Sequence, residues 1–142
     1  MILPDINLLL YAHDERAPLH QPSRQWWEAL LNAERTVVLP WVVIFGFIRL
    51  TTSPSVLLQP LPPDDALRRV LGWLAQPPVE ILDPGPRHLE IVGRLFSVTG
   101  VAGKLTTDTH LAALAIEHQC ELHSNDTDFA RFPGLRWHNP LA

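Results

Sequence analysis

Short apolar segments alternate with segments of helical length along this chain, and this alternation constrains its fold more than any other feature. The strand-like segments are residues 1–3, 36–39, 79–82, 120–123 and, more weakly, 135–137. The helix-like segments are residues 7–12, 18–33, 40–50, 64–75, 86–99 and 108–119, with loops at 51–63 and 101–107. Strands that alternate with helices favour right-handed crossovers. We therefore predict an α/β fold: a three-layer α/β/α sandwich with a central, mostly parallel sheet.

Proline and aspartate residues suggest where two of these helices begin. Pro40 suits the first position of a helix, where its missing N–H costs nothing. Asp64 or Asp65 is expected to cap the next helix through its carboxylate. In the helix at 18–33, Trp26 and Trp27 lie on the apolar side. We expect this pair in the core and at a dimer surface rather than in a platform for stacked bases.

Length and cysteine content are those of one small domain. The 142 residues suit a single domain, 1–142, with one hydrophobic core. Cys120 is the only cysteine, so an internal disulfide cannot form, which fits a reducing cytoplasm. The first residues lack the basic region of a signal peptide. The longest apolar stretch, 37–50, is interrupted by Pro40, Gly46 and Arg49, so we expect no membrane association.

Four aspartates stand where predicted strands end or a helix begins. Asp5 follows the first strand, Asp108 opens the helix at 108–119, and Asp126 and Asp128 follow the fourth strand. The carboxyl ends of parallel strands meet at one crevice, so these side chains are expected to converge. Carboxylates brought that close repel each other, by about 4 kcal/mol per pair at 4 Å and an effective dielectric of 20. A cation relieves this repulsion, and an all-oxygen ligand set favours Mg²⁺, with Mn²⁺ as the other candidate.

Each aspartate also has an ordinary structural explanation. Asp5 or Asp108 alone would more often be a helix N-cap, and Asp126 with Asp128 would form an Asx-type turn. Asn7 could orient the Asp5 carboxylate or simply complete a turn. Taken together at three separate places, the aspartates favour a site. Walker, dinucleotide-binding and nucleophile-elbow motifs are absent, and the seven histidines are expected to be structural or exposed.

These residues also carry a resemblance to a known family. The segments Asp-Ile-Asn-Leu-Leu-Leu-Tyr-Ala from Asp5, Phe-Gly-Phe-Ile-Arg-Leu from Phe45, Asp-Thr-His-Leu-Ala-Ala-Leu-Ala from Asp108 and Asn-Asp-Thr-Asp-Phe from Asn125 resemble the PIN-domain toxins of VapBC toxin–antitoxin systems. The resemblance spans nearly the whole chain, and the order and spacing of its segments are fairly specific.

The resemblance implies an Mg²⁺-dependent endoribonuclease that is inhibited by a cognate VapB-type antitoxin and is usually a homodimer. By position, Asp5, Asp108 and Asp126 match the first, third and fourth acidic residues of the family and are the implied metal ligands, with Asp128 beside them as a further catalytic residue. The second acidic residue is missing, because Gly46 stands where the family usually has Glu. Glu90 and Glu117 are possible substitutes.

The function predicted from the sequence is metal-assisted hydrolysis of RNA phosphodiester bonds. Single-stranded or loop RNA is expected, because its backbone can reach a recessed site. The net charge of −4 counts mildly against nucleic acid, but ten of the eleven cationic residues are arginines, which suit phosphate.

Several roles and alternatives stay open at this level. Arg16, Arg49 and Arg131 are candidate phosphate contacts, Arg49 is equally a partner of the carboxylates, and Ser124 is a candidate neighbour of the site. One alternative function is a catalytically degenerate PIN-fold binding module, for which Gly46 is the main support. A phosphate-receiving signalling domain is disfavoured, because it needs a lysine after a late strand and Lys104 lies in a loop.

Overall fold

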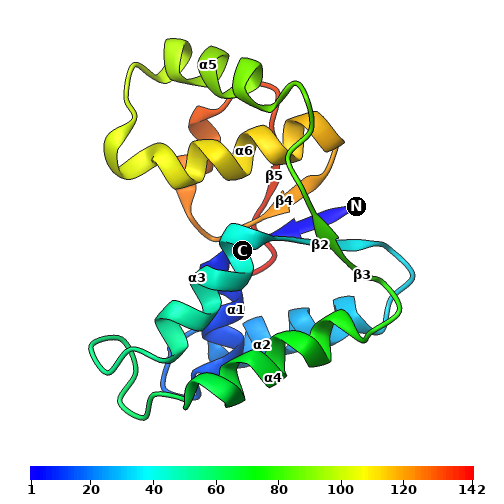
Figure 1. Cartoon of the computed structure of the whole chain (residues 1–142), viewed down its shortest axis with the longest axis vertical. Helices are drawn as coiled ribbons and strands as arrows, with labels where there is room; N and C mark the ends of the chain where they lie inside the picture. Colours follow the sequence, from blue (N-terminus) through cyan, green and yellow to red (C-terminus); the bar gives the residue numbers. More distant parts are fainter.

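The computed structural model describes all 142 residues and contains a five-stranded sheet in which every neighbouring pair of strands is parallel (Figure 1). The strands are β1 (Ile2–Pro4), β2 (Val37–Pro40), β3 (Val79–Leu82), β4 (Glu121–His123) and β5 (Arg136–His138). Their order across the sheet is β3-β2-β1-β4-β5. Because β1 is central, the residue that follows it, Asp5, lies at the middle of the carboxyl edge.

Helices cover both faces of this sheet, as predicted for a three-layer sandwich. The helices are α1 (Ile6–His13), α2 (His20–Leu31), α3 (Trp41–Thr51), α4 (Pro63–Leu74), α5 (His88–Thr99) and α6 (Thr106–His118), with short 3-10 turns η1 (Gly103–Leu105) and η2 (Thr127–Arg131). Figure 1 shows α1 to α4 on one side of the sheet and α5 with α6 on the other. The order of strands and helices expected from the sequence is therefore confirmed.

The core explains why the segments adopt these structures. β1 and β2 are buried along their whole length, which is typical of strands covered on both faces. In α6 the run Leu111–Ala115 is fully buried, and its small alanines let the helix pack closely on the sheet. Trp27 is 5% exposed and packs edge-on against Trp73, which confirms the core position expected for it.

All six helices start one or two residues from their predicted positions, and at three of them this changes the role expected for a proline or an aspartate. Pro40 is the last residue of β2 and the N-cap of α3, with extended backbone, so the helix begins at Trp41. The α4 helix begins at Pro63, so Asp64 and Asp65 lie in its first turn instead of capping it. A negative charge still stabilises that turn through the helix dipole. The α6 helix begins at Thr106, two residues before Asp108, after a 3-10 turn where a loop was expected.

Candidate active site

The four predicted aspartates come together at the carboxyl edge of the sheet. Asp5 follows β1 and caps α1, and Asp108 lies in the first turn of α6. Asp126 caps η2 after β4, and Asp128 lies within that turn. The adjacent strands β1 and β4 run in the same direction, so their ends deliver Asp5 and the segment 124–128 to one place. The convergence expected from the chain order is thus present in the folded chain.

Three of the four form a compact group. Asp108, Asp126 and Asp128 each present one carboxylate oxygen, and these oxygens lie within 4.8 Å of one another. All three side chains are partly exposed, so a cation could reach them. The sequence had suggested Asp5, Asp108 and Asp126 as the metal ligands. In the structure the compact group contains Asp128 instead of Asp5.

Asp5 lies deeper than the other aspartates and is 6% exposed. Its Oδ1 accepts a hydrogen bond from the Ile6 N–H at 2.7 Å, and its Oδ2 accepts one from the Ser124 hydroxyl at 2.8 Å. The Ser124 Oγ also accepts from the Asp126 N–H at 3.0 Å. Ser124 is fully buried, and these two hydrogen bonds link Asp5 with the backbone of Asp126.

Burial and mutual repulsion make the cluster electrostatically unfavourable without a cation. Burial raises the pKa of Asp108 to about 6, and the charges of Asp5, Asp126 and Asp128 add to the rise. Burial also raises the pKa of Asp5, while its hydrogen bonds from Ser124 and Ile6 act in the opposite direction. A raised carboxyl pKa means that the ionised form is destabilised. The carboxylates are therefore arranged to favour a positive charge among them.

The predicted arginines differ in their relation to this cluster. Arg131 pairs with Asp128 at 3.5 Å. Arg49 is exposed on α3 and forms no salt bridge, so it is not an ion-pair partner of the carboxylates but is available to phosphate. Arg16 lies beyond the C-terminal end of α1, about 12 Å or more along the helix from Asp5. The half-buried Asn7 makes no side-chain hydrogen bond, so it does not orient Asp5.

Gly46, where the family usually has Glu, faces a hydrophobic side chain. A Cβ placed on Gly46 would lie 2.5 Å from Ile6 Cδ1 and 3.1 Å from Ile6 Cγ1. Ile6 therefore occupies the space into which a side chain at position 46 would extend. The suggested substitutes do not fill the gap: Glu90 is exposed and pairs with Arg87, and Glu117 accepts backbone hydrogen bonds from the segment after β3.

His88 and His110 contact each other directly, although the sequence predicted only structural or exposed histidines. His88 and His110 approach each other through Nε2 and Nδ1 at 2.8 Å, so α5 is joined to α6. His123, also expected to be structural or exposed, is 5% exposed and hydrogen-bonded through both ring nitrogens, contacts that the sequence did not predict. The signal available in the sequence was an imidazole at the end of β4, a strand that pairs on one side with the apolar strand β1.

Comparison with known proteins supports the same conclusion as the geometry. A family model described as the PIN domain matches residues 2–135. The chain is 49% identical over 141 residues to Ribonuclease VapC33 of Mycobacterium tuberculosis, with 99% of each chain covered. It is 39% identical to Ribonuclease VapC37 of the same species, with 100% of this chain and 99% of that protein covered. The chain is a PIN-domain protein of the VapC family.

Solved structures of distant VapC-family proteins share its fold. One chain of the solved structure of VapBC2 from Rickettsia felis, bound to a DNA fragment from its promoter, superposes with a TM-score of 0.71 at 20% identity, covering 98% of each chain. VapBC-1 of nontypeable Haemophilus influenzae gives a TM-score of 0.71 at 15% identity, with full coverage of both chains. No helix in this VapC-family chain has the length and apolar character needed to cross a membrane.

Proposed function

We propose that this protein is a metal-dependent endoribonuclease and the toxin of a VapBC-type toxin–antitoxin pair. The observation that carries the proposal is the group of three carboxylate oxygens from Asp108, Asp126 and Asp128 within 4.8 Å of one another. Membership of the VapC family and the names of its relatives, which are ribonucleases, support the reaction class. An RNA substrate and an antitoxin partner would place this activity in the cytoplasm.

The ligand set fits one hard divalent cation. All candidate donors are carboxylate oxygens, which suit Mg²⁺ or Mn²⁺ better than zinc. The raised pKa of Asp108 indicates that the ion pair between Arg131 and Asp128 does not offset the negative charge around Asp108. Since Gly46 contributes no ligand and Ile6 fills the adjacent space, we propose one tightly held ion rather than two. When bound, the cation supplies Lewis acidity that activates water and neutralises phosphate charge.

The surrounding residues have distinct proposed roles. Asp108, Asp126 and Asp128 hold the cation, and Ser124 keeps Asp5 and the Asp126 backbone in place. Each oxygen of Asp5 accepts one hydrogen bond and retains a second lone pair, so it can still take up a proton released by water. Exposed Arg49 is proposed to bind an RNA phosphate, and single-stranded or loop RNA best fits a site at the sheet edge.

The test is cleavage of a mixed, end-labelled RNA pool by the purified protein with Mg²⁺, with Mn²⁺ and with EDTA. Cleavage should require a divalent cation, and Asp126→Asn should reduce it at least about 100-fold. The control is Glu90→Gln, since Glu90 is exposed and pairs only with Arg87. This variant should cleave like wild type. If the wild-type protein binds Mn²⁺ but cleaves no RNA, the nuclease proposal is wrong. The alternative function, a catalytically degenerate binding module, would then be favoured.

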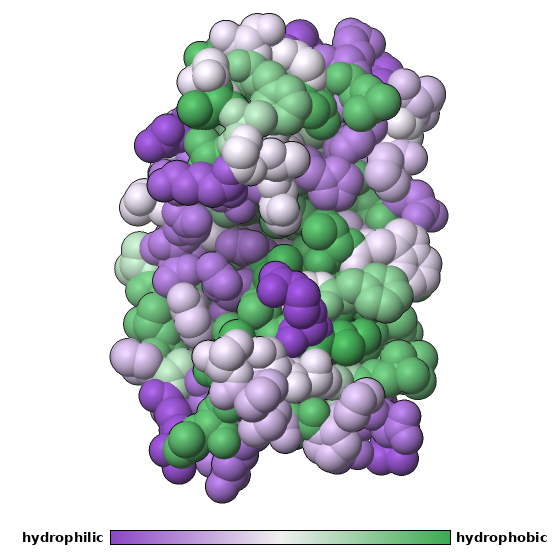
Figure 2. Space-filling model, turned by 60° about the vertical axis from the view of Figure 1, so that its left-hand side comes forward, coloured by the Kyte–Doolittle hydropathy of each residue, from purple (hydrophilic) through white to green (hydrophobic).

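Exposed apolar side chains offer surface for the proposed protein partners. Trp41 and Phe45 on α3 are 47% and 62% exposed and stack with their ring centres 6.3 Å apart. Leu67 and Leu71 on α4 are exposed as well. Figure 2 shows patches of hydrophobic side chains separated by strongly hydrophilic ones on one face. We propose a homodimer and a complex with a VapB-type antitoxin, which co-expression followed by size-exclusion chromatography would test.

A further inference from the structure

The end of β4 determines where two of the aspartates lie. The carbonyl oxygen of its last residue, His123, accepts a hydrogen bond from the Asp5 N–H at 2.9 Å. The next residue, Ser124, donates its hydroxyl to Asp5 at 2.8 Å and accepts from the Asp126 N–H at 3.0 Å. Any displacement of His123 would therefore be passed to Asp5 and to the segment that carries Asp126.

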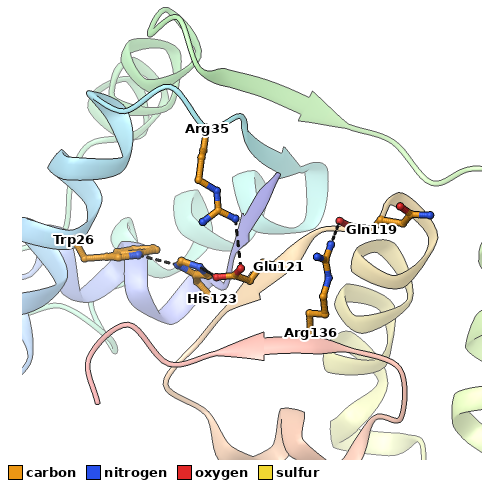
Figure 3. A network of polar contacts seen from close by, with 6 residues as sticks. All are labelled: Trp26, Arg35, Gln119, Glu121, His123 and Arg136. Atoms are coloured by element: carbon orange, nitrogen blue, oxygen red, sulfur yellow. Dashed lines mark hydrogen bonds and ion pairs between the residues drawn. The ribbon is translucent and has the colours of Figure 1, made fainter.

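The His123 side chain is held by two hydrogen bonds of its own. Its Nδ1 accepts a hydrogen bond from the Trp26 indole N–H at 3.0 Å, and its Nε2 lies 2.7 Å from Glu121 Oε1 (Figure 3). An indole nitrogen can only donate, so Nδ1 carries no proton and Nε2 is the protonated nitrogen that donates to Glu121. Both nitrogens are satisfied, and the orientation of the ring is fixed.

This polar network connects separate parts of the fold. Trp26 belongs to α2, and Glu121 also accepts from Arg35, in the loop before β2, at 3.4 Å. On the β5 side, the His138 carbonyl accepts from the Ser124 N–H at 3.1 Å, and the Trp137 indole donates to the Ser124 carbonyl at 2.9 Å. The residues just before the acidic segment, His123 and Ser124, are thus held by hydrogen bonds from α2 and from β5.

A hydrophobic residue could fill the same buried position without any need for partners. Burying an imidazole is unfavourable unless its hydrogen bonds are complete, whereas a well-packed apolar side chain needs none. The inner strands β1 and β2 use apolar residues throughout. What the imidazole provides here, and an apolar residue would not, is a directional link from α2 to the strand end that supports Asp5.

We propose that His123 is a positioning residue of the acidic site. Its imidazole, held between Trp26 and Glu121, fixes the end of β4 so that the His123 carbonyl and the Ser124 hydroxyl keep Asp5 and Asp126 in a geometry that binds the cation. The effect on RNA cleavage rests on the proposed nuclease function. The effect on cation binding does not, and can be measured separately.

Two neighbouring tryptophans of α2 provide a matched test. Trp26→Phe removes the N–H that donates to His123. Trp27→Phe removes the neighbouring and more deeply buried indole of the same helix, but the Trp27 Nε1 has no hydrogen-bond partner. The measurements are Mn²⁺ affinity by calorimetric titration, kcat and KM for RNA cleavage, and the melting temperature. His123→Phe is the second variant of the network.

Trp26→Phe should weaken Mn²⁺ binding and lower kcat about 10-fold, the lower end of the range for residues that orient metal ligands. KM for RNA should change less than about twofold, and Trp27→Phe should bind Mn²⁺ and cleave like wild type. If Trp26→Phe and Trp27→Phe lower the melting temperature alike and leave Mn²⁺ affinity intact, the network is only structural and the proposal is wrong. If His123→Phe does not fold, the Mn²⁺ affinity of Trp26→Phe still shows whether the network positions the acidic site. If wild type cleaves no RNA, the nuclease proposal fails, while the Mn²⁺ titrations still decide the role of His123.

Discussion

Replacing Asp108 by Asn tests whether the aspartates are crowded together as the structure indicates. The rise of the Asp108 pKa from 3.8 to about 6 corresponds to about 3 kcal/mol against the ionised form. Because the side chain is partly exposed, solvent screening reduces this to about 1.5 kcal/mol. Asn also loses a favourable interaction of about 0.5 kcal/mol with the N-terminal end of α6. The net gain in stability is about 1 kcal/mol for the metal-free protein.

The size of this gain in stability depends on pH. A carboxyl whose pKa is higher in the folded than in the unfolded state has no destabilising effect below its ordinary pKa, and its full effect develops as pH rises through the folded-state pKa. For Asp108 that window runs from 3.8 to about 6. Asp108→Asn should therefore melt about 3 °C higher than wild type near pH 8, and no higher near pH 4.

Thermal unfolding in EDTA at both pH values measures this difference, and the same protein is assayed for RNA cleavage with Mg²⁺. The stabilised variant should be inactive. Glu90→Gln, at an exposed residue outside the cluster, should show no pH-dependent gain. If Asp108→Asn gains nothing at the higher pH, Asp108 is not repelled by its neighbours. If it also keeps its activity, Asp108 is not a metal ligand, and the proposed site is wrong.

Three further changes test other parts of the site. Mg²⁺ or Mn²⁺ at 100 times its dissociation constant should stabilise wild type by about 2.7 kcal/mol, and an unshifted melting curve would argue against any cation site. Gly46→Glu should destabilise the protein by about 1–3 kcal/mol, because the new Cβ at position 46 would clash with the Ile6 side chain. Adding Ile6→Ala to this variant should restore stability, and calorimetry should then show tighter Mn²⁺ binding than in wild type. Unchanged Mn²⁺ affinity in that double variant would show that position 46 does not face the cation. Ser124→Ala should cost about 1–3 kcal/mol and reduce cleavage, because Asp5 Oδ2 and the Asp126 N–H lose their partner; normal activity would exclude a positioning role for Ser124.

The sequence alone was enough to predict the three layers of the fold and the edge of the sheet at which the acidic site lies. Apolar segments of strand length between helices leave few topologies open, since crossovers between parallel strands have one hand. The same rule brings residues after different strands to one edge of the sheet. Asp5, Asp108, Asp126 and Asp128 could therefore be placed together before any contact was known. Helix starts were less certain, because Pro40 and Asp64 are each compatible with more than one terminal position.

The tertiary structure decided which aspartates form the compact group and what surrounds them. The hydrogen bond between Ser124 and Asp5 joins residues 119 positions apart, and that between Trp26 and His123 joins residues 97 apart. Ile6 and Gly46 likewise meet only because α1 packs against α3. Local sequence patterns report on periodicity within one segment, whereas these contacts depend on how two segments pack. That is why Asp128 rather than Asp5 completes the group, and why the roles of Ile6 and His123 could not be read from the chain alone.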